Sequence, residues 1–259
     1  MREFKNVDNK DIILGRNSVI EALKVGRSIN RLMIAEGSRD GSIQKLIALA
    51  KDKKIIIEHV QRDKLDKISE GQRHQGVIAY AAPVEYSTLD EILEFAESKK
   101  EVPFLLLLDE LEDPHNFGAI LRTADAVGVH GVLIPKRRSV SLNATVAKTS
   151  AGAIEYVRVA QINNVAQTLK QLKDLNFTVI GSDVEGYDLY NQTEDIDFTY
   201  PIILIIGNEG KGMRRLTKKN CDFLVKIPMV GRINSLNASV AGAVLMYEIF
   251  SNRRILNMN

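Results

Sequence analysis

The sequence has little of the chemistry that would crosslink the chain or bind a metal. Its 259 residues include one cysteine, no tryptophan and four scattered histidines. A lone Cys221 can form neither an internal disulfide nor a thiolate zinc site, and the histidines lack the spacing of metal ligands. We therefore expect no metal site, and we interpret Cys221 as a small buried residue.

Long apolar runs are also absent. Runs such as Phe104 to Leu108 and Ile202 to Ile206 are far shorter than the roughly 20 residues that cross a bilayer. The first ten residues carry mixed charge and no apolar stretch, unlike a secretory signal. We therefore expect a cytoplasmic protein that does not interact with a membrane.

The composition is that of a folded protein with uneven charge. Hydrophobic residues make up 45% of the chain, which is enough to build real cores. The net charge of +2 is distributed as +5 over residues 1–83, −8 over 84–135 and +5 over 136–259. The basic segments could form an RNA surface if they fold together, but solvated faces explain these charges equally well.

The first 83 residues alternate helical and strand patterns, which indicates a small α/β sandwich. Its six expected elements are a helix from Asn17 or Ser18 to Gly26, a strand at 31–35, a helix from Ser42, a strand at 55–60, a helix at 62–70 and a strand at 76–82. Pro83 interrupts the pattern because proline cannot donate within a strand. We expect a domain at 1–83 and a linker with one helix at 84–102.

Residues 103–259 alternate continuous apolar strands with helices. This pattern indicates a mostly parallel sheet that is buried on both faces. The expected strands are 104–108, 131–134, 177–181, 202–206 and 223–227, and the expected helices are 89–98, 116–127, 164–175 and 237–251. The heptapeptides at 141–147 and 235–241 differ at one position, and we interpret them as two similar helix caps rather than a duplication.

Ligands bind beyond the carboxyl ends of parallel strands, and unusual polar residues occur at three such places. In the first, Asn116 is expected to cap a helix that carries Arg122 among apolar residues, where a cation needs either an acidic partner or a ligand. In the second, Gly207-Asn-Glu-Gly-Lys-Gly212 directly follows a strand, and its glycines allow a ligand to approach the backbone closely. A plain turn is the alternative, because this loop is neither a Walker loop nor a dinucleotide fingerprint.

The third place is the polar segment that leads into the last helix. Taken singly, Ser235 and Asn237 are more often helix caps than catalytic residues. In order, however, the stretches HNFGAILRTA, IIGNEGKGM and IPMVGRINSLNASVAGAVLMYE resemble the three signature motifs of the SpoU (TrmH-type) family of RNA ribose 2′-O-methyltransferases. The resemblance covers residues 103–251.

The N-terminal sandwich resembles the L30e-like RNA-binding domain of the family's 23S ribosomal RNA branch. The stretch Ile134-Pro-Lys-Arg-Arg-Ser139 adds to that similarity. The resemblance implies a deep trefoil knot, a homodimer and S-adenosylmethionine as methyl donor. It further implies methylation of a guanosine ribose in the P-site loop of 23S RNA. The alternatives are a sister enzyme acting on tRNA or another ribosomal position, and a non-catalytic RNA-binding protein.

The resemblance also implies roles for individual residues. The donor would be bound by Gly207, Glu209, Gly210, Ile227 and Leu236, and the reaction centre would be formed by Asn116, Arg122, Glu209, Ser235 and Asn237. The family mechanism makes the arginine a general base, but a guanidinium stays protonated in proteins. We therefore expect Arg122 to stabilise the developing 2′-alkoxide or to clamp a phosphate, while Glu209, a water or the RNA phosphate accepts the proton.

Overall fold

The computed structural model describes residues 12–38, 40–191, 195–232 and 235–256. The N-terminal segment on which we based the absence of a signal lies outside the described residues, as do Ile233 and Asn234 of the third motif. The chain divides into two compact units. The first comprises Met1–Glu85 and Leu142–Tyr156, and the second Tyr86–Ser141 and Val157–Asn259.

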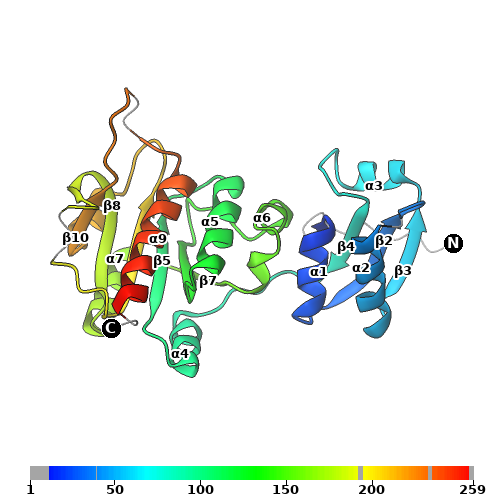
Figure 1. Cartoon of the computed structure of the whole chain (residues 1–259), viewed down its shortest axis with the longest axis horizontal. Helices are drawn as coiled ribbons and strands as arrows, with labels where there is room; N and C mark the ends of the chain where they lie inside the picture. Colours follow the sequence, from blue (N-terminus) through cyan, green and yellow to red (C-terminus); the bar gives the residue numbers. More distant parts are fainter. Residues whose placement is uncertain (1–11, 39, 192–194, 233–234, 257–259) are drawn as a thin grey trace. The chain divides into compact units, whose positions relative to one another are not determined.

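The first unit contains a four-stranded sheet in the order β1-β4-β2-β3 (Figure 1). Its elements up to Glu85 are β1 (Ile12–Leu14), α1 (Arg16–Lys24), β2 (Ile29–Ala35), α2 (Gly41–Asp52), β3 (Ile56–Val60), α3 (Arg62–Ile68) and β4 (Val77–Ala81). Strand β4 is antiparallel to β1 and β2, whereas β2 and β3 are parallel. Helices α1 and α2 bury one face of the sheet and α3 the other, because successive strand residues point to opposite faces. The six predicted elements are confirmed, and β1 is added.

The first unit is completed by residues 142–156, which we had assigned to the second domain. This segment holds α6 (Ala144–Thr149) and a 3₁₀ turn at Ala153–Glu155. The Ser18 hydroxyl donates to the Ala147 carbonyl at 3.2 Å, and Arg27 Nη1 lies 2.6 Å from Glu155 Oε1 in a largely buried ion pair. Nothing in the local sequence pattern indicates this long-range association.

The second unit is a six-stranded sheet in the order β10-β8-β9-β5-β6-β7, in which every neighbouring pair is parallel. Its elements are α4 (Leu89–Lys99), β5 (Phe104–Asp109), α5 (Pro114–Ala126), β6 (Gly131–Pro135), β7 (Arg158–Ile162), α7 (Val165–Asp174), β8 (Thr178–Asp188), β9 (Ile202–Gly207), α8 (Arg215–Lys219), β10 (Phe223–Lys226) and α9 (Ala238–Leu256). The predicted fold class, a parallel-sheet α/β domain with a smaller N-terminal α/β unit, is confirmed.

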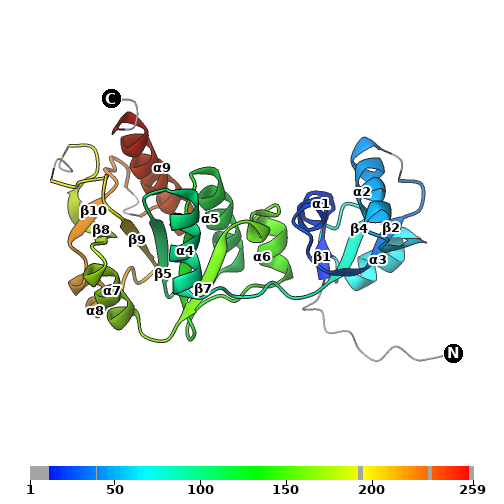
Figure 2. The ribbon, with the colours of Figure 1, turned by 90° about the horizontal axis from the view of Figure 1, so that it is seen from below.

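Helices cover both faces of this sheet, as the continuous apolar strands predict. Leu105 and Leu107 of β5 pack in one cluster with residues of α4 and α7. On the opposite face α9 packs against α5 and β9, and a Cβ added to Gly242 would lie 2.6 Å from Ile206 Cδ1. Figure 2 shows α9 on one side of the sheet and α7 and α8 on the other. Since all six strands are parallel, the loops that follow them gather at one edge.

The structure differs from the sequence-based expectation at three elements. Helix α5 begins at Pro114 and is capped by Asp113, whose carboxylate accepts from the amides of His115 and Asn116 at 3.0 and 3.2 Å. The prediction that Asn116 is the cap is therefore wrong, although the Asp-Pro pair is a recognised helix start. Strand β7 and helix α8 were not predicted, because an edge strand and a five-residue helix carry little apolar periodicity.

The two related heptapeptides are both helix caps, as expected. In the first, Asn143 Oδ1 accepts from the Val146 amide at 3.0 Å. In the second, Asn237 Oδ1 accepts from the amides of Ser239 and Val240 at 3.0 and 3.4 Å.

Candidate functional site

A cavity of about 1020 Å³ lies at the carboxyl ends of β9 and β10 and beside residues 182–185 of β8. Its walls include residues 182–185, 206–213 and 226–229, with Gly231, Ser235 and Leu236. All five residues expected to bind the donor line it: Gly207, Glu209, Gly210, Ile227 and Leu236. The second and third motifs therefore form one pocket, at the edge of a parallel sheet where ligands bind.

The loop after β9 is folded tightly enough to bring its backbone against a ligand. A Cβ added to Gly207 would lie 2.4 Å from the carbonyl carbon of Gly212, so only glycine fits there. Gly212 has a φ of 65°, a conformation that glycine adopts without strain. The backbones of Asn208 and Gly212 are joined by two hydrogen bonds of 2.8 and 3.2 Å.

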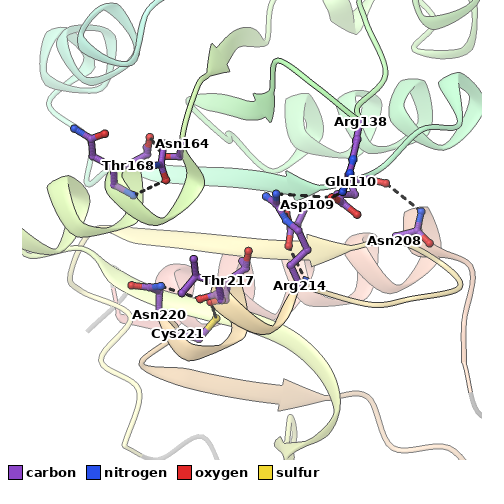
Figure 3. Close-up of polar contacts among 12 residues, drawn as sticks. Asp109, Glu110, Arg138, Asn164, Thr168, Asn208, Arg214, Thr217, Asn220 and Cys221 are labelled. Atoms are coloured by element: carbon purple, nitrogen blue, oxygen red, sulfur yellow. Dashed lines mark hydrogen bonds and ion pairs between the residues drawn. The ribbon is translucent and has the colours of Figure 1, made fainter.

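The Asn208 side chain stabilises this loop through hydrogen bonds, a role that the sequence did not indicate. Its Oδ1 accepts from the amides of Gly210 and Lys211 at 2.9 and 3.2 Å. Its Nδ2 donates to the Glu110 carbonyl at 3.0 Å, as Figure 3 shows. The loop is thus fixed both to itself and to the end of β5.

Three of the expected reaction-centre residues, one from each motif, form a connected hydrogen-bond chain. Asn116 Nδ2 donates to Glu209 Oε1, and Asn237 Nδ2 donates to Asn116 Oδ1 at 3.0 Å. Glu209 also lines the cavity. Because an ionised carboxylate only accepts hydrogen bonds, Glu209 fixes the direction of both amides. The three motifs are therefore joined by hydrogen bonds, and Glu209 is the member of this chain that lines the cavity.

The other two expected reaction-centre residues, Ser235 and Arg122, are not members of this hydrogen-bond chain. Ser235 is exposed and lines the cavity. Arg122 is an exposed residue of α5, about 120° around the helix from Asn116 by helical geometry. It makes no hydrogen bond or ion pair with any residue that the structure describes. The acidic partner that we considered for Arg122 is thus not found there, and its guanidinium is free for a ligand.

An ion pair between a buried carboxylate and a partly exposed arginine lies behind the site and was missed from the sequence. Asp109, the fully buried last residue of β5, accepts from the Arg214 amide at 2.9 Å and from its Nε at 2.8 Å (Figure 3). The Arg214 Nη2 atom lies 2.6 Å from the same carboxylate. Charged hydrogen bonds of this kind fix geometry strongly. They fix the position of residue 214 against the sheet just after the glycine loop.

Acidic and basic side chains share the cavity. Lys218 Nζ lies 3.0 Å from a carboxylate oxygen of each of Asp183 and Glu185, and these hydrogen-bonded acids raise the pKa of Lys218. Arg215 and Lys226 also line the wall. Such a mixed lining suits a ligand with both an amine and a carboxylate.

The other titratable residues considered, His130 and Cys221, lie in surroundings that fit a structural role. His130 is buried, with Nε2 2.9 Å from Glu101 Oε2, and desolvation lowers its pKa. Burial raises the pKa of the Cys221 thiol to about 12. Within the described part of the chain, no three His, Cys, Asp or Glu residues are grouped so that they could hold a metal ion. No described helix is long and apolar enough to cross a membrane.

Comparison with known families gives two matches along the chain. Residues 103–247 match the model of the SpoU rRNA methylase family. Residues 12–87 match the model described as RNA 2′-O ribose methyltransferase substrate binding.

Curated relatives resemble nearly the whole chain. A putative TrmH family tRNA/rRNA methyltransferase of Bacillus subtilis, YacO, is 51% identical over 243 residues, which cover 94% of this chain and 96% of the relative. A similarly named protein of Staphylococcus aureus is 48% identical, with 93% and 96% covered.

Solved structures share the fold. A crystal structure of an RNA 2′-O ribose methyltransferase aligns with a TM-score of 0.76 at 26% identity and covers 93% of this chain and 88% of its own. The SpoU methyltransferase AviRb of Streptomyces viridochromogenes, solved with AdoMet, aligns with a TM-score of 0.74 at 22% identity and covers 93% and 89%.

Proposed function

The chain belongs to the SpoU rRNA methylase family, and from this premise we propose that it transfers a methyl group from S-adenosylmethionine to a ribose 2′-hydroxyl of RNA. The observation that carries the proposal is the hydrogen-bond chain from Glu209, which lines the cavity, through Asn116 to Asn237. One residue of each motif contributes to it. A protein that only bound RNA would need neither this hydrogen-bond chain nor the cavity beside it.

The cavity fits the proposed methyl donor. Its volume of about 1020 Å³ is at the upper end of the range for small-molecule sites, about 300–1,000 Å³. The close approach of Gly207 to the backbone of Gly212 keeps the loop folded tightly beside the cavity. We propose that Gly207, Ile227 and Leu236 contact the adenosine part through their backbones, while Glu209 and Gly210 shape the loop. When bound, S-adenosylmethionine supplies an electrophilic sulfonium methyl group.

The chain's own residues would position the ribose and move its proton. Asn116 holds one oxygen of Glu209, and the other has no hydrogen-bond partner among the described residues. Glu209 can therefore accept the 2′-proton directly or through a water. Arg122, whose guanidinium is free, would stabilise the developing 2′-oxyanion or an adjacent phosphate. Ser235 would help to orient the ribose from the cavity rim.

For the substrate, we propose a guanosine in the P-site loop of 23S ribosomal RNA. Support comes from the match of residues 12–87 to an RNA substrate-binding model and from the match of residues 103–247 to the SpoU rRNA methylase family. The relatives are named tRNA/rRNA methyltransferases, so transfer RNA is the second candidate. We expect action in the cytoplasm during ribosome assembly, because ribosomal RNA is available there.

The experiment is to offer the purified chain protein-free 23S RNA and bulk transfer RNA with a labelled donor. We expect one labelled ribose in 23S RNA, at a linkage that resists alkaline cleavage. Methyl groups on a base would refute the 2′-O-transfer. Methylation of transfer RNA alone would refute the ribosomal target.

We also propose that the chain forms a homodimer through α9 and keeps the family's trefoil knot. Val240, Val244 and Tyr247 follow helical spacing, and the first and last are about half exposed, so that a partner helix could cover them as one apolar stripe. The segments that follow β9 and β10 line one cavity, as a knotted crossing would require. Light scattering should give twice the chain mass, and Val240→Asp with Tyr247→Asp should give the monomer.

A further inference from the structure

A second cavity, of about 770 Å³, lies beyond the carboxyl ends of β6 and β7 and was assigned no role above. It is lined by residues 135–138, 163–166, Arg214, Leu216 and Thr217. We propose that this groove, called here the basic groove, binds a backbone phosphate of the RNA near the nucleotide to be methylated. The proposal rests on the proposed function and adds a specific site to it.

The charge of the basic groove points to an anionic ligand. Four of its lining side chains are cations, Lys136, Arg137, Arg138 and Arg214, and none is a carboxylate. Lys136 and Arg137 are exposed, and neither side chain has an ion-pair partner among the described residues. Two free cations beside each other suit a phosphate, which accepts several charged hydrogen bonds.

The other two cations lie near acids at the end of β5. Arg138 Nη1 lies 3.6 Å and Arg214 Nη1 3.7 Å from Glu110 Oε1, as Figure 3 shows for Arg138. The buried Asp109 holds the rest of the Arg214 guanidinium. These acids orient the arginines while Lys136 and Arg137 keep the groove cationic.

The start of α7 forms another wall of the basic groove. Val165 and Ala166 are the first residues of this helix, which has ten residues and no acid in its first turn. First-turn amides have no acceptor within their helix and carry its positive partial charge. They therefore add hydrogen-bond donors to the side-chain cations.

The basic groove and the donor cavity are separated by one short segment. Met213 and Arg215 line the donor cavity, whereas Arg214, Leu216 and Thr217 line the groove. An RNA strand that passes over residues 213–217 could place a backbone phosphate in the basic groove and a ribose at the donor cavity. Leu216 is 61% exposed within the groove, and it offers apolar surface that a nucleoside can cover but inorganic phosphate cannot. RNA is thus a better fit than free phosphate.

The test removes the two unpaired cations, in the variant Lys136→Gln with Arg137→Gln. Lys100→Gln with Lys170→Gln is the matched control, since it removes the same charge from exposed positions of the same unit. RNA affinity is measured by fluorescence anisotropy over a range of salt concentrations. Donor affinity is measured by calorimetry, and kcat and KM for RNA by methyl transfer.

We expect the groove variant to weaken RNA binding about tenfold and to lower the salt slope by about 1, as loss of phosphate contacts does. KM for RNA should rise while donor affinity stays at the wild-type value. The control should change RNA affinity and slope much less. If the groove variant and the control behaved alike, the proposal would be wrong.

A titration with inorganic phosphate distinguishes RNA from free phosphate as the ligand of the basic groove. Amide resonances of Val165 and Ala166 should shift when the wild type is titrated with phosphate, and once RNA is bound, added phosphate should no longer change them. A groove variant that lost phosphate binding but kept wild-type RNA affinity and salt slope would mark a free-phosphate site and overturn the proposal. If the groove governed RNA binding but no RNA was methylated, the proposed function would fail while the groove assignment was supported.

Discussion

Replacing Asn237 should separate its structural role from its role in the reaction centre. Its Oδ1 caps α9 by accepting from the amides of Ser239 and Val240 and from the Ser239 hydroxyl, while its Nδ2 donates to Asn116. Aspartate keeps the capping oxygen but lacks the donor, and alanine lacks both. Asn237→Asp therefore removes only the hydrogen bond to Asn116, whereas Asn237→Ala removes both this hydrogen bond and the helix cap.

The stability changes follow from the cap. Asn237→Ala should lower the free energy of unfolding by about 1 kcal/mol, the usual value of an N-cap. For a chain of this size that corresponds to a fall in Tm of about 2–4 °C. Asn237→Asp should leave Tm close to the wild-type value, because a negative charge at a helix N-terminus stabilises it by about 0.3–1 kcal/mol, partly offsetting repulsion from Glu209.

Both variants should lose activity. In Asn237→Asp, the Asn116 amide lies between two carboxylates and can donate its NH₂ group toward only one of them, so its carbonyl must face the other. We expect single-turnover methyl transfer to fall about 100-fold, the cost of a reacting group displaced by about 1 Å. Full activity in Asn237→Asp would refute the orienting role of the chain from Glu209. A Tm loss in Asn237→Asp as large as in Asn237→Ala would refute the capping role.

Four further outcomes are expected. Arg122→Ala should abolish turnover and change donor affinity only a few-fold by calorimetry, and near-normal turnover in Arg122→Lys would contradict a role for the planar guanidinium. Gly207→Ala should prevent donor binding, because its Cβ would overlap the loop backbone; unchanged affinity would refute that close approach. Cys221 is partly buried and its pKa is raised to about 12, so it should react with a thiol reagent at pH 8 much more slowly in the native than in the denatured protein, and equally fast native labelling would contradict the raised pKa. Arg27→Met should destabilise the protein by about 3–5 kcal/mol near pH 7, by leaving buried Glu155 unpaired. Since desolvation already raises the pKa of Glu155, this loss should shrink as pH falls and the carboxyl is protonated, and a pH-independent loss in denaturant titrations would refute the mechanism.

Local patterns in the sequence were sufficient to predict most of the sheet and its helices. The apolar run Ile202 to Ile206 became a central strand because both its faces are buried, which is what an uninterrupted run indicates. The five residues expected at the donor site line one cavity because the loops after parallel strands meet at one edge.

Contacts between distant residues could not be predicted in the same way. Asp109 and Arg214 are 105 positions apart, and no local pattern distinguishes this arginine from the others. Asn208 looks like an ordinary turn residue until the loop closes around its side chain. The start of α5 was also misplaced, because the Asp113 cap was overlooked.

The split composition of the first unit affects the order in which the chain can fold during synthesis. Its sheet is complete at residue 81, but its last packing segment ends at Tyr156, about 70 residues after Glu85. At about 5–20 residues per second, translation needs roughly 4–14 s to supply it. Until then Arg27 lacks its carboxylate partner and Ser18 its acceptor. By that time β5 and β6 of the second unit have already been made, so the first unit gains its last packing segment only after synthesis of the second unit has begun.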